Sequence, residues 1–305
     1  MGNLPQNMSK PMSAWLLATR PKTLPAAVAP VIVGCAMAYV DRKFSLGPAM
    51  ACLAVALLLQ VAVNLANDFF DFSKGIDTVE RLGPVRVTQS GLIPPGRVKA
   101  AITTVFVLSL LPGLYLVTIA GWPVVVIGAA AVMAALAYSG GPYPLASHGL
   151  GDLFVFIFFG LVAVCGTYYV QALRLTPMVM VMGAVVGLMI TAILVVNNLR
   201  DIETDQRAGK RTLAVMIGRQ KTQSEYAFLL AGAYAVPVFL WLDGLASAWL
   251  LLPLATLPLA LLHIRLIRQS PDGPALNDLL AQTAGLAFFF SLLLAIGLIL
   301  SLSWC

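Results

Sequence analysis

Three long stretches of this chain contain no Asp, Glu, Lys or Arg: residues 100–151, 175–199 and 279–305. Uncharged segments of this length are typical of helices that cross roughly 30 Å of hydrocarbon with about 20 apolar residues. Only 10% of the residues are charged, and the mean hydropathy is +0.90. A soluble domain is about one quarter charged. A soluble globular protein and a disordered chain are therefore both excluded.

Glycine, proline and polar turns divide the apolar sequence into nine expected helical spans. We predict an all-α, polytopic membrane protein in which the 305 residues form a single domain. The first apolar segment has small residues near its end, as a signal peptide does, but we interpret it as an uncleaved span. The expected spans are 24–40, 47–72, 99–119, 122–139, 152–171, 177–199, 226–242, 246–264 and 281–302.

The distribution of the 19 basic residues predicts the orientation of these spans. If the N-terminus is cytoplasmic and the C-terminus lies outside, all of them face the cytoplasm except Arg42, Lys43 and Arg174. This asymmetry follows the positive-inside rule and supports the count of nine. A basic protein can instead bind nucleic acid, but these bases flank apolar spans. We therefore expect membrane lipid, and no nucleic acid, as a partner.

More than half of the 13 acidic residues fall in two short windows, 64–80 and 197–212. Each window starts inside an apolar span with asparagine and continues with aspartate at a spacing of four: Asn67 and Asp71 in the first window, and Asn197, Asp201 and Asp205 in the second. A spacing of four places side chains on one face of a helix. Both windows lie at expected cytoplasmic ends, and an even number of crossings separates them. They therefore resemble the two halves of a parallel internal repeat.

Carboxylate and carboxamide oxygens are the ligands that hard cations such as Mg²⁺ prefer. Both windows also contain bases, among them Lys74, Lys210 and Arg211, whose natural partner is a phosphate group. The windows therefore predict a metal–phosphate site. Ordinary charges at a membrane interface and a cation site of a transporter remain open alternatives, although transporter sites tend to lie near the midplane of the bilayer.

At these residues the sequence resembles the UbiA-type intramembrane prenyltransferases, and within them the branch that prenylates 1,4-dihydroxy-2-naphthoate. The stretches that carry the resemblance are 20–25, 64–77, 81–86 and 197–218, the last with its Gly209–Leu213 core. The resemblance covers essentially the whole chain. One departure concerns the third acid of the first family motif, because Gly75 stands at its position and Asp77 follows two residues later.

The resemblance implies a nine-helix bundle that uses Mg²⁺ to transfer a polyprenyl group from its diphosphate to the naphthoate ring. Decarboxylation would give demethylmenaquinone, in an active site that faces the cytoplasm of the cell (inner) membrane. The implied metal ligands are Asp68, Asp71, Asp201 and Asp205. Lys74 and Tyr138 are further candidate catalytic residues. The candidate substrate-binding residues are Asn64, Asn67, Asn197, Lys210, Arg211, Arg20, Lys22, Arg86 and Asp77.

Two alternative functions remain open, and a third is disfavoured. A transferase of the same family with another aromatic acceptor, such as 4-hydroxybenzoate, is the first alternative, and a cation-coupled transporter is the second. A CDP-alcohol phosphotransferase is disfavoured because its Asp-Gly-x-x-Ala-Arg signature is absent. Asp152, after Gly-Leu-Gly at the start of the fifth span, is interpreted as a possible N-cap.

Overall fold

The computed structural model describes residues 11–75, 82–269 and 273–301, and every regular element within these ranges is helical. The elements in chain order are α1 (Pro11–Thr19), η2 (Pro21–Thr23), α2 (Pro25–Val40), α3 (Leu46–Ser73), α4 (Pro95–Ala120), α5 (Trp122–Ser139), η3 (Leu145–His148), α6 (Gly151–Val155), η4 (Phe156–Val162), α7 (Ala163–Ala172), α8 (Pro177–Arg200), α9 (Ile202–Arg207), α10 (Leu213–Ile217), α11 (Arg219–Leu242), η5 (Ala248–Thr256), α12 (Leu257–Gln269) and α13 (Gly273–Ser301).

Eight helices in the described ranges are long and apolar enough to cross a membrane, and a bent pair brings the number to nine. The pair is α1–η2 followed by α2, with an angle of 49° between its two parts. Proline accounts for the break: Pro21 and Pro25 each start a new helical segment, and Arg20, just before Pro21, has a left-handed backbone. The all-α prediction is confirmed, and the expected nine spans agree with this count.

Several predicted boundaries were wrong, for local reasons. The third span begins earlier, at Pro95, because proline is favoured in the first turn of a helix. The segment between the expected sixth and seventh spans, 200–225, is mostly helical and contains α9, α10 and the first turns of α11. The fifth span is not uniform, since η4 forms a π-helical segment between α6 and α7. The eighth span starts as the 3₁₀ helix η5, which contains Pro253.

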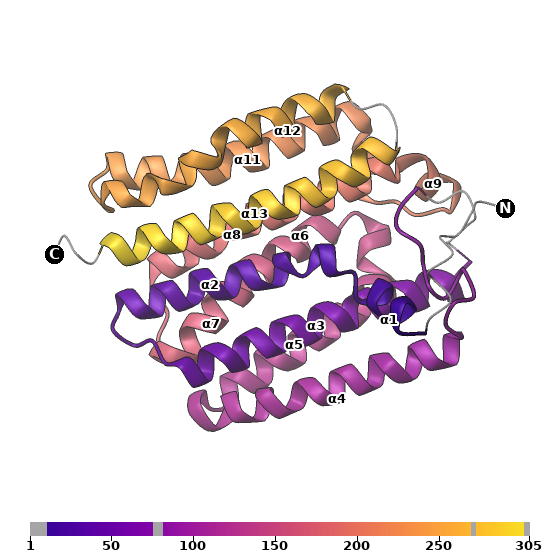
Figure 1. The fold of residues 1–305 in the computed structure, drawn as a ribbon, viewed down its shortest axis with the longest axis horizontal. Coiled ribbons are helices and arrows are strands. Elements are labelled where there is room, and N and C mark those ends of the chain that lie inside the picture. Colours follow the sequence, from indigo (N-terminus) through magenta and orange to yellow (C-terminus); the bar gives the residue numbers. More distant parts are fainter. Residues whose placement is uncertain (1–10, 76–81, 270–272, 302–305) are drawn as a thin grey trace.

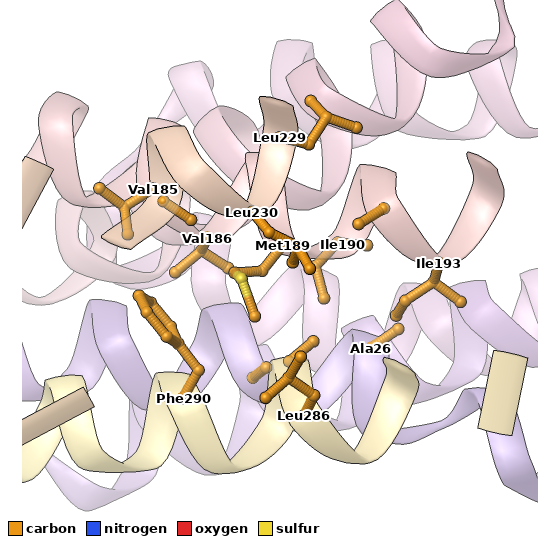
Figure 2. Packing of buried hydrophobic residues seen from close by; sticks show 14 of the residues in the cluster. Ala26, Val185, Val186, Met189, Ile190, Ile193, Leu229, Leu230, Leu286 and Phe290 are labelled. Carbon is orange, nitrogen blue, oxygen red and sulfur yellow. The ribbon is translucent and has the colours of Figure 1, made fainter. Parts of the chain in front are cut away.

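Helix α8 lies at the centre of the bundle and contacts α2, η4, α7, α11 and α13. Its Val186, Met189 and Ile190 are buried against Leu230 of α11 and Phe290 of α13, as Figure 2 shows. On its other side, glycines allow an unusually close approach to η4. A Cβ on Gly160 of η4 would lie 2.5 Å from the Cα of Gly187 of α8. Small residues promote such close helix packing in membranes.

The long helices run side by side, with α11 and α12 at one edge of the bundle and α4 and α5 at the other (Figure 1). The short helices α1 and α9 lie at one end of the bundle, and the C-terminal end of α13 lies at the opposite end (Figure 1). Helix α3 has 28 residues, about 42 Å in length. It is therefore longer than the hydrocarbon layer, and its last turns reach the end where α1 and α9 lie.

Candidate active site

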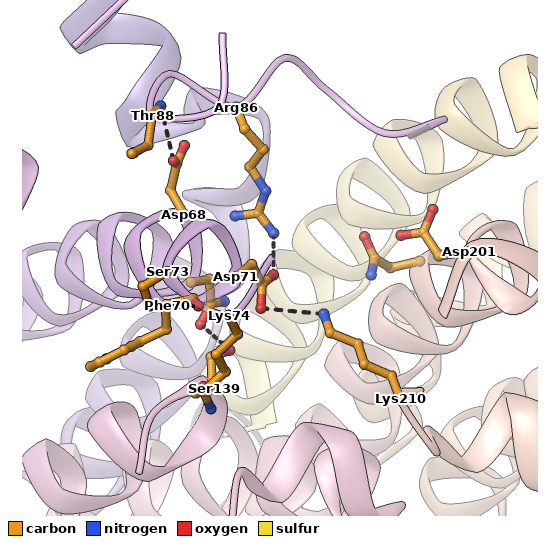
Figure 3. Close-up of polar contacts among 12 residues, drawn as sticks. Asp68, Phe70, Asp71, Ser73, Lys74, Arg86, Thr88, Ser139, Asp201 and Lys210 are labelled. Atoms are coloured by element: carbon orange, nitrogen blue, oxygen red, sulfur yellow. Dashed lines mark hydrogen bonds and ion pairs between the residues drawn. The ribbon is translucent and has the colours of Figure 1, made fainter. Parts of the chain in front are cut away.

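Asp71, in the last turn of α3, lies between two cations from different parts of the chain (Figure 3). Its Oδ2 accepts a hydrogen bond from Nη2 of Arg86 at 2.8 Å, and its Oδ1 is 3.3 Å from Nζ of Lys210. The side chains of Asp71 and Arg86 are almost completely buried. Arg86 belongs to the segment after α3 and Lys210 to the segment after α9. The structure therefore brings residues of both sequence windows into contact.

Asp68, one turn earlier on α3, holds the segment that carries Arg86. Its two carboxylate oxygens accept hydrogen bonds from the backbone N–H groups of Val87, at 2.9 Å, and Thr88, at 3.1 Å. Asp68 is buried, so these bonds also satisfy an otherwise costly charge. In this structure Asp68 fixes the position of Arg86 beside Asp71. The role as a metal ligand that the resemblance implied stays a prediction, since each oxygen retains a second lone pair.

The end of α5 contributes polar contacts on the other side of α3. The hydroxyl of Ser139 donates to Oδ1 of Asn67 at 2.8 Å. The ammonium of Lys74 donates to the backbone carbonyls of Ser139, at 2.7 Å, and Gly141, at 3.3 Å (Figure 3). Partial burial lowers the pKa of Lys74, and the nearby Asp71 charge opposes that shift. Lys74 and Asn67 thus join α3 to α5 beside Asp71.

Arg200 makes most of the polar contacts of the second window. From the sequence it was expected only as a base that flanks a span. Its guanidinium makes two hydrogen bonds to the carboxylate of Asp201 and others to the side-chain oxygens of Asn197 and Asn277. Arg200 is 1% exposed. Asn277 of α13 also donates to the backbone carbonyl of Leu82, at 2.7 Å. A hydrogen-bonded chain therefore runs from Asp201 to the start of the segment that carries Arg86.

The turn after α9 directs Lys210 toward Asp71. Gly209 has a φ of +75°, a backbone conformation that glycine adopts easily at the end of a helix. The backbone N–H of Lys210 then donates to the carbonyl of Asp205 at 2.9 Å. Arg211 is exposed, but its backbone N–H donates to the carbonyl of Ser147 at 3.0 Å. The side chain of Asp205 is partly buried at this end of the bundle.

Asn64 stabilises the bend between α1 and α2. Its Nδ2 donates to the carbonyl of Thr19 at 3.0 Å and to the hydroxyl of Thr23 at 3.2 Å. Between these threonines lie Arg20, whose φ is +51°, and the exposed Lys22. In this structure Asn64 contacts the turn that carries two other candidates, and its substrate-binding role stays a prediction.

Tyr138 and Asp77 are the remaining candidate residues from the sequence. Tyr138 of α5 lies beside the start of α6, because its hydroxyl would be 3.3 Å from a Cβ on Gly151. Asp77 lies outside the described residues. The N-cap interpretation of Asp152 was wrong: Leu150 is the N-cap of α6, and no side chain caps this helix.

In the described part of the chain, no three Asp, Glu, His or Cys side chains lie close enough to hold one metal ion. Asp71 and Asp201 are instead paired with basic side chains, and Figure 3 shows Asp201 apart from the Asp71 cluster. The donors nevertheless suit Mg²⁺, because aspartate and asparagine oxygens from α3 and α8 gather at one end of the bundle.

The fold and this cluster define a polytopic helical membrane protein with a buried acid–base site at one end of its bundle. Residues 27–293 match the UbiA prenyltransferase family. The chain therefore belongs to the UbiA prenyltransferase family, and it is an integral membrane protein with many spans.

Two relatives of the same name are similar to this chain over nearly its whole length. The chain is 38% identical, over 294 residues, to a 1,4-dihydroxy-2-naphthoate octaprenyltransferase of Escherichia coli (strain K12), with 94% of this chain and 96% of that protein covered. It is 40% identical to a protein of the same name from Mycobacterium tuberculosis (strain ATCC 25618 / H37Rv), with 90% and 92% covered.

Solved structures support the fold. A UbiA homolog from Archaeoglobus fulgidus bound to GPP and Mg²⁺ matches with a TM-score of 0.67 and 14% identity, over 94% of this chain and 99% of that one. A UbiA homolog from Aeropyrum pernix K1 matches with a TM-score of 0.69 and 16% identity, over 92% and 98%. At these identities the likeness concerns the fold alone.

Proposed function

We propose that this protein transfers a polyprenyl group from its diphosphate to 1,4-dihydroxy-2-naphthoate, with loss of CO₂. The product would be demethylmenaquinone, an intermediate of menaquinone biosynthesis. The observation that carries the proposal is the buried cluster in which Asp71 contacts Arg86 and Lys210. Relatives that are named for this naphthoate reaction and are 31–40% identical over most of the chain support the choice of acceptor.

The candidate metal ligands are Asp71, Asp201 and Asp205, with Asp68 as the fourth and with Asn67 and Asn197 beside them. Mg²⁺, when bound, would act as a Lewis acid and neutralise the negative charge that grows on the departing diphosphate. Two solved structures of a UbiA homolog from Archaeoglobus fulgidus hold Mg²⁺ together with a prenyl diphosphate. The buried carboxylates here fit that ion, because their cost of desolvation is relieved by a cation.

Arg86 and Lys210 would bind the diphosphate in this proposal. Both cations contact Asp71, a candidate metal ligand, so they would lie close to a diphosphate bound through that metal. Fixed positive charge at that place stabilises the leaving group more strongly in a buried site than in water. Lys74 and Arg211 would add further positive charge near the diphosphate.

Arg20 and Lys22 are the candidates for binding the carboxylate of the acceptor. They lie in the turn that Asn64 fixes next to α3. Tyr138 would shield the reacting centre from water, because it directly precedes Ser139 in α5 and its hydroxyl lies beside the start of α6. The positive-inside asymmetry supports a site that faces the cytoplasm.

Purified protein supplied with a long-chain prenyl diphosphate, Mg²⁺ and one aromatic acid at a time tests this proposal. Prenylated, decarboxylated product from the naphthoate is the expected result. Activity on 4-hydroxybenzoate alone would move the protein to another branch of the family. No diphosphate release with any acceptor would favour the transporter alternative.

Lys210→Gln provides a sharper test of the site, with Lys221→Gln as the matched control, since Lys221 is an exposed lysine of α11. We expect the first variant to weaken prenyl diphosphate binding at least tenfold and the second to leave it unchanged. Equal binding by the two variants would contradict the assignment of Lys210.

A further inference from the structure

Asp152 is a buried carboxylate that the proposed mechanism has not used. It is 7% exposed, and neither of its side-chain oxygens has a hydrogen-bond partner in another residue of the described chain. Burial of an unpaired charge is costly, and buried polar groups are nearly always hydrogen-bonded. Its place in the first turn of α6 accounts for an acid there, since acids suit helix N-termini. It does not account for the burial of a carboxylate that receives no hydrogen bond from another described residue.

The surroundings of Asp152 belong to the same end of the bundle as the candidate active site. The preceding residue, Gly151, lies against the hydroxyl of Tyr138. The next residue of α5, Ser139, bonds to Asn67 and Lys74 of the first window. Asp152 is therefore separated from the Asp71 motif by the end of α5.

The segment before Asp152 also contacts the second window. Ser147 accepts a hydrogen bond from the backbone N–H of Arg211, and Gly149 packs against Met216 of α10, just after that window. Glu225 of α11 is close enough for its charge to interact with that of Asp152. Asp152 thus stands among elements of both windows, which makes it a candidate for contact with the second substrate.

The two substrates of the proposed reaction differ in charge and in hydrogen-bonding groups. A prenyl diphosphate is an anion with acceptor oxygens, and Asp152 would repel it. An aromatic acceptor with ring hydroxyls is a donor, and a carboxylate in a site of low polarity binds an O–H group strongly. The missing partner of Asp152 is therefore a hydroxyl donor, not a phosphate.

We infer that Asp152 is a catalytic residue that binds the hydroxyl next to the reacting carbon of the aromatic acceptor and takes its proton. This inference rests on the proposed function. As the allylic C–O bond breaks and the new C–C bond forms at the carboxylate-bearing carbon, the hydroxyl proton moves to Oδ of Asp152. The ring oxygen then becomes a carbonyl. When the bond to CO₂ breaks, its electron pair returns to this oxygen, which takes the proton back from Asp152.

This cycle consumes no proton and no external base, and diphosphate and CO₂ leave as separate products. A general base in hydrogen-bond reach of the proton it takes typically contributes 10²–10⁴-fold to the rate. Asp152→Asn keeps the shape of the side chain but cannot accept the proton, whereas Asp152→Glu retains the carboxylate.

The test compares wild type, Asp152→Asn, Asp152→Glu and the control Asp243→Asn, an exposed aspartate at the C-cap of α11. Each protein is assayed for kcat and KM with dihydroxynaphthoate, for prenyl diphosphate affinity, and for thermal unfolding. Asp152→Asn should lower kcat/KM for the acceptor about 10²-fold or more. Its prenyl diphosphate affinity should stay within about twofold of wild type, its Tm should not fall, and Asp152→Glu should recover part of the rate.

A second comparison uses an acceptor whose hydroxyl next to the carboxylate-bearing carbon is methylated. Wild type should turn over this analogue far more slowly than dihydroxynaphthoate, and Asp152→Asn should discriminate little between the two. Unchanged kcat/KM in Asp152→Asn, an equal fall in diphosphate affinity, or undiminished discrimination would each overturn the inference. A wild-type protein that does not prenylate dihydroxynaphthoate would instead overturn the proposed function on which it rests.

Discussion

The ammonium of Lys210 and the carboxylate of Asp71 lie 3.3 Å apart, although they belong to different windows of the sequence. Arg86 binds the other oxygen of the same carboxylate. The buried acid thus has cations on both of its oxygens, drawn from the two segments that follow α3 and α9. These contacts hold the two segments together at the end of the bundle, and they suggest the first prediction.

Asp71→Ala should abolish prenyl transfer and also destabilise the protein. Removing one partner of a buried ion pair typically costs about 3–5 kcal/mol, because the other charge stays buried. Arg86 would be that charge here, since its side chain is almost completely buried. Product assays and thermal unfolding in detergent check both effects. Normal turnover in Asp71→Ala would refute its place in the active site.

Arg200→Lys should fold poorly even though it conserves the charge. Arg200 bonds at once to Asp201, Asn197 and Asn277, and a lysine cannot reproduce this fork of donors. We expect a loss of about 2–4 kcal/mol of stability and at least a tenfold loss of activity. Arg219→Lys, whose partner Glu203 is exposed, is the control. Similar unfolding temperatures for the two variants would contradict this reading of Arg200.

Gly160→Ala should destabilise the bundle, since its Cβ would meet the backbone of Gly183 and Gly187 at 2.5–2.9 Å. Overpacking of this kind typically costs about 1–3 kcal/mol. Gly166→Ala, on the adjoining helix α7, meets nothing within 4 Å and should be neutral or slightly stabilising. Thermal unfolding of both variants tests the close approach of η4 and α8, which equal stabilities would disprove.

Asp41→Asn should produce a small, pH-dependent loss of stability at the end of the bundle opposite the candidate active site. Burial raises the pKa of Asp41, but the hydrogen bonds from Tyr168 and Arg174 and the charge of Arg174 outweigh it, so the pKa is lowered. A pKa below its value in the unfolded chain means that the stabilisation is present above about pH 4 and is lost as the pH falls further.

Arg174 is 58% exposed, so the contribution is weak, and we expect the Tm of Asp41→Asn to fall by less than about 4 °C at neutral pH. The difference from wild type should vanish in acid, and turnover should be unaffected. A difference in Tm that grows in acid would have the wrong sign for this ion pair.

The sequence by itself determined the membrane fold and predicted a candidate site at the ends of two helices. Long uncharged stretches are stable as helices inside a membrane, so the spans could be predicted before any packing was known. Asparagine and aspartate at a spacing of four likewise marked the ends of α3 and α8, because helix geometry alone places them on one face. Segment ends and irregular turns, such as η4 and η5, were missed because packing and proline geometry decide them.

Only the tertiary structure decided which side chains meet. Arg200 and Asn277 carry no local signal, since their contacts depend on how α8 and α13 pack. The same holds for Asp68, whose partners are backbone amides of a distant segment, and for Asp152, whose burial without a donor is visible only in three dimensions. Periodicity along a chain determines which face a residue occupies, but the element opposite that face is fixed by the packing of the whole bundle.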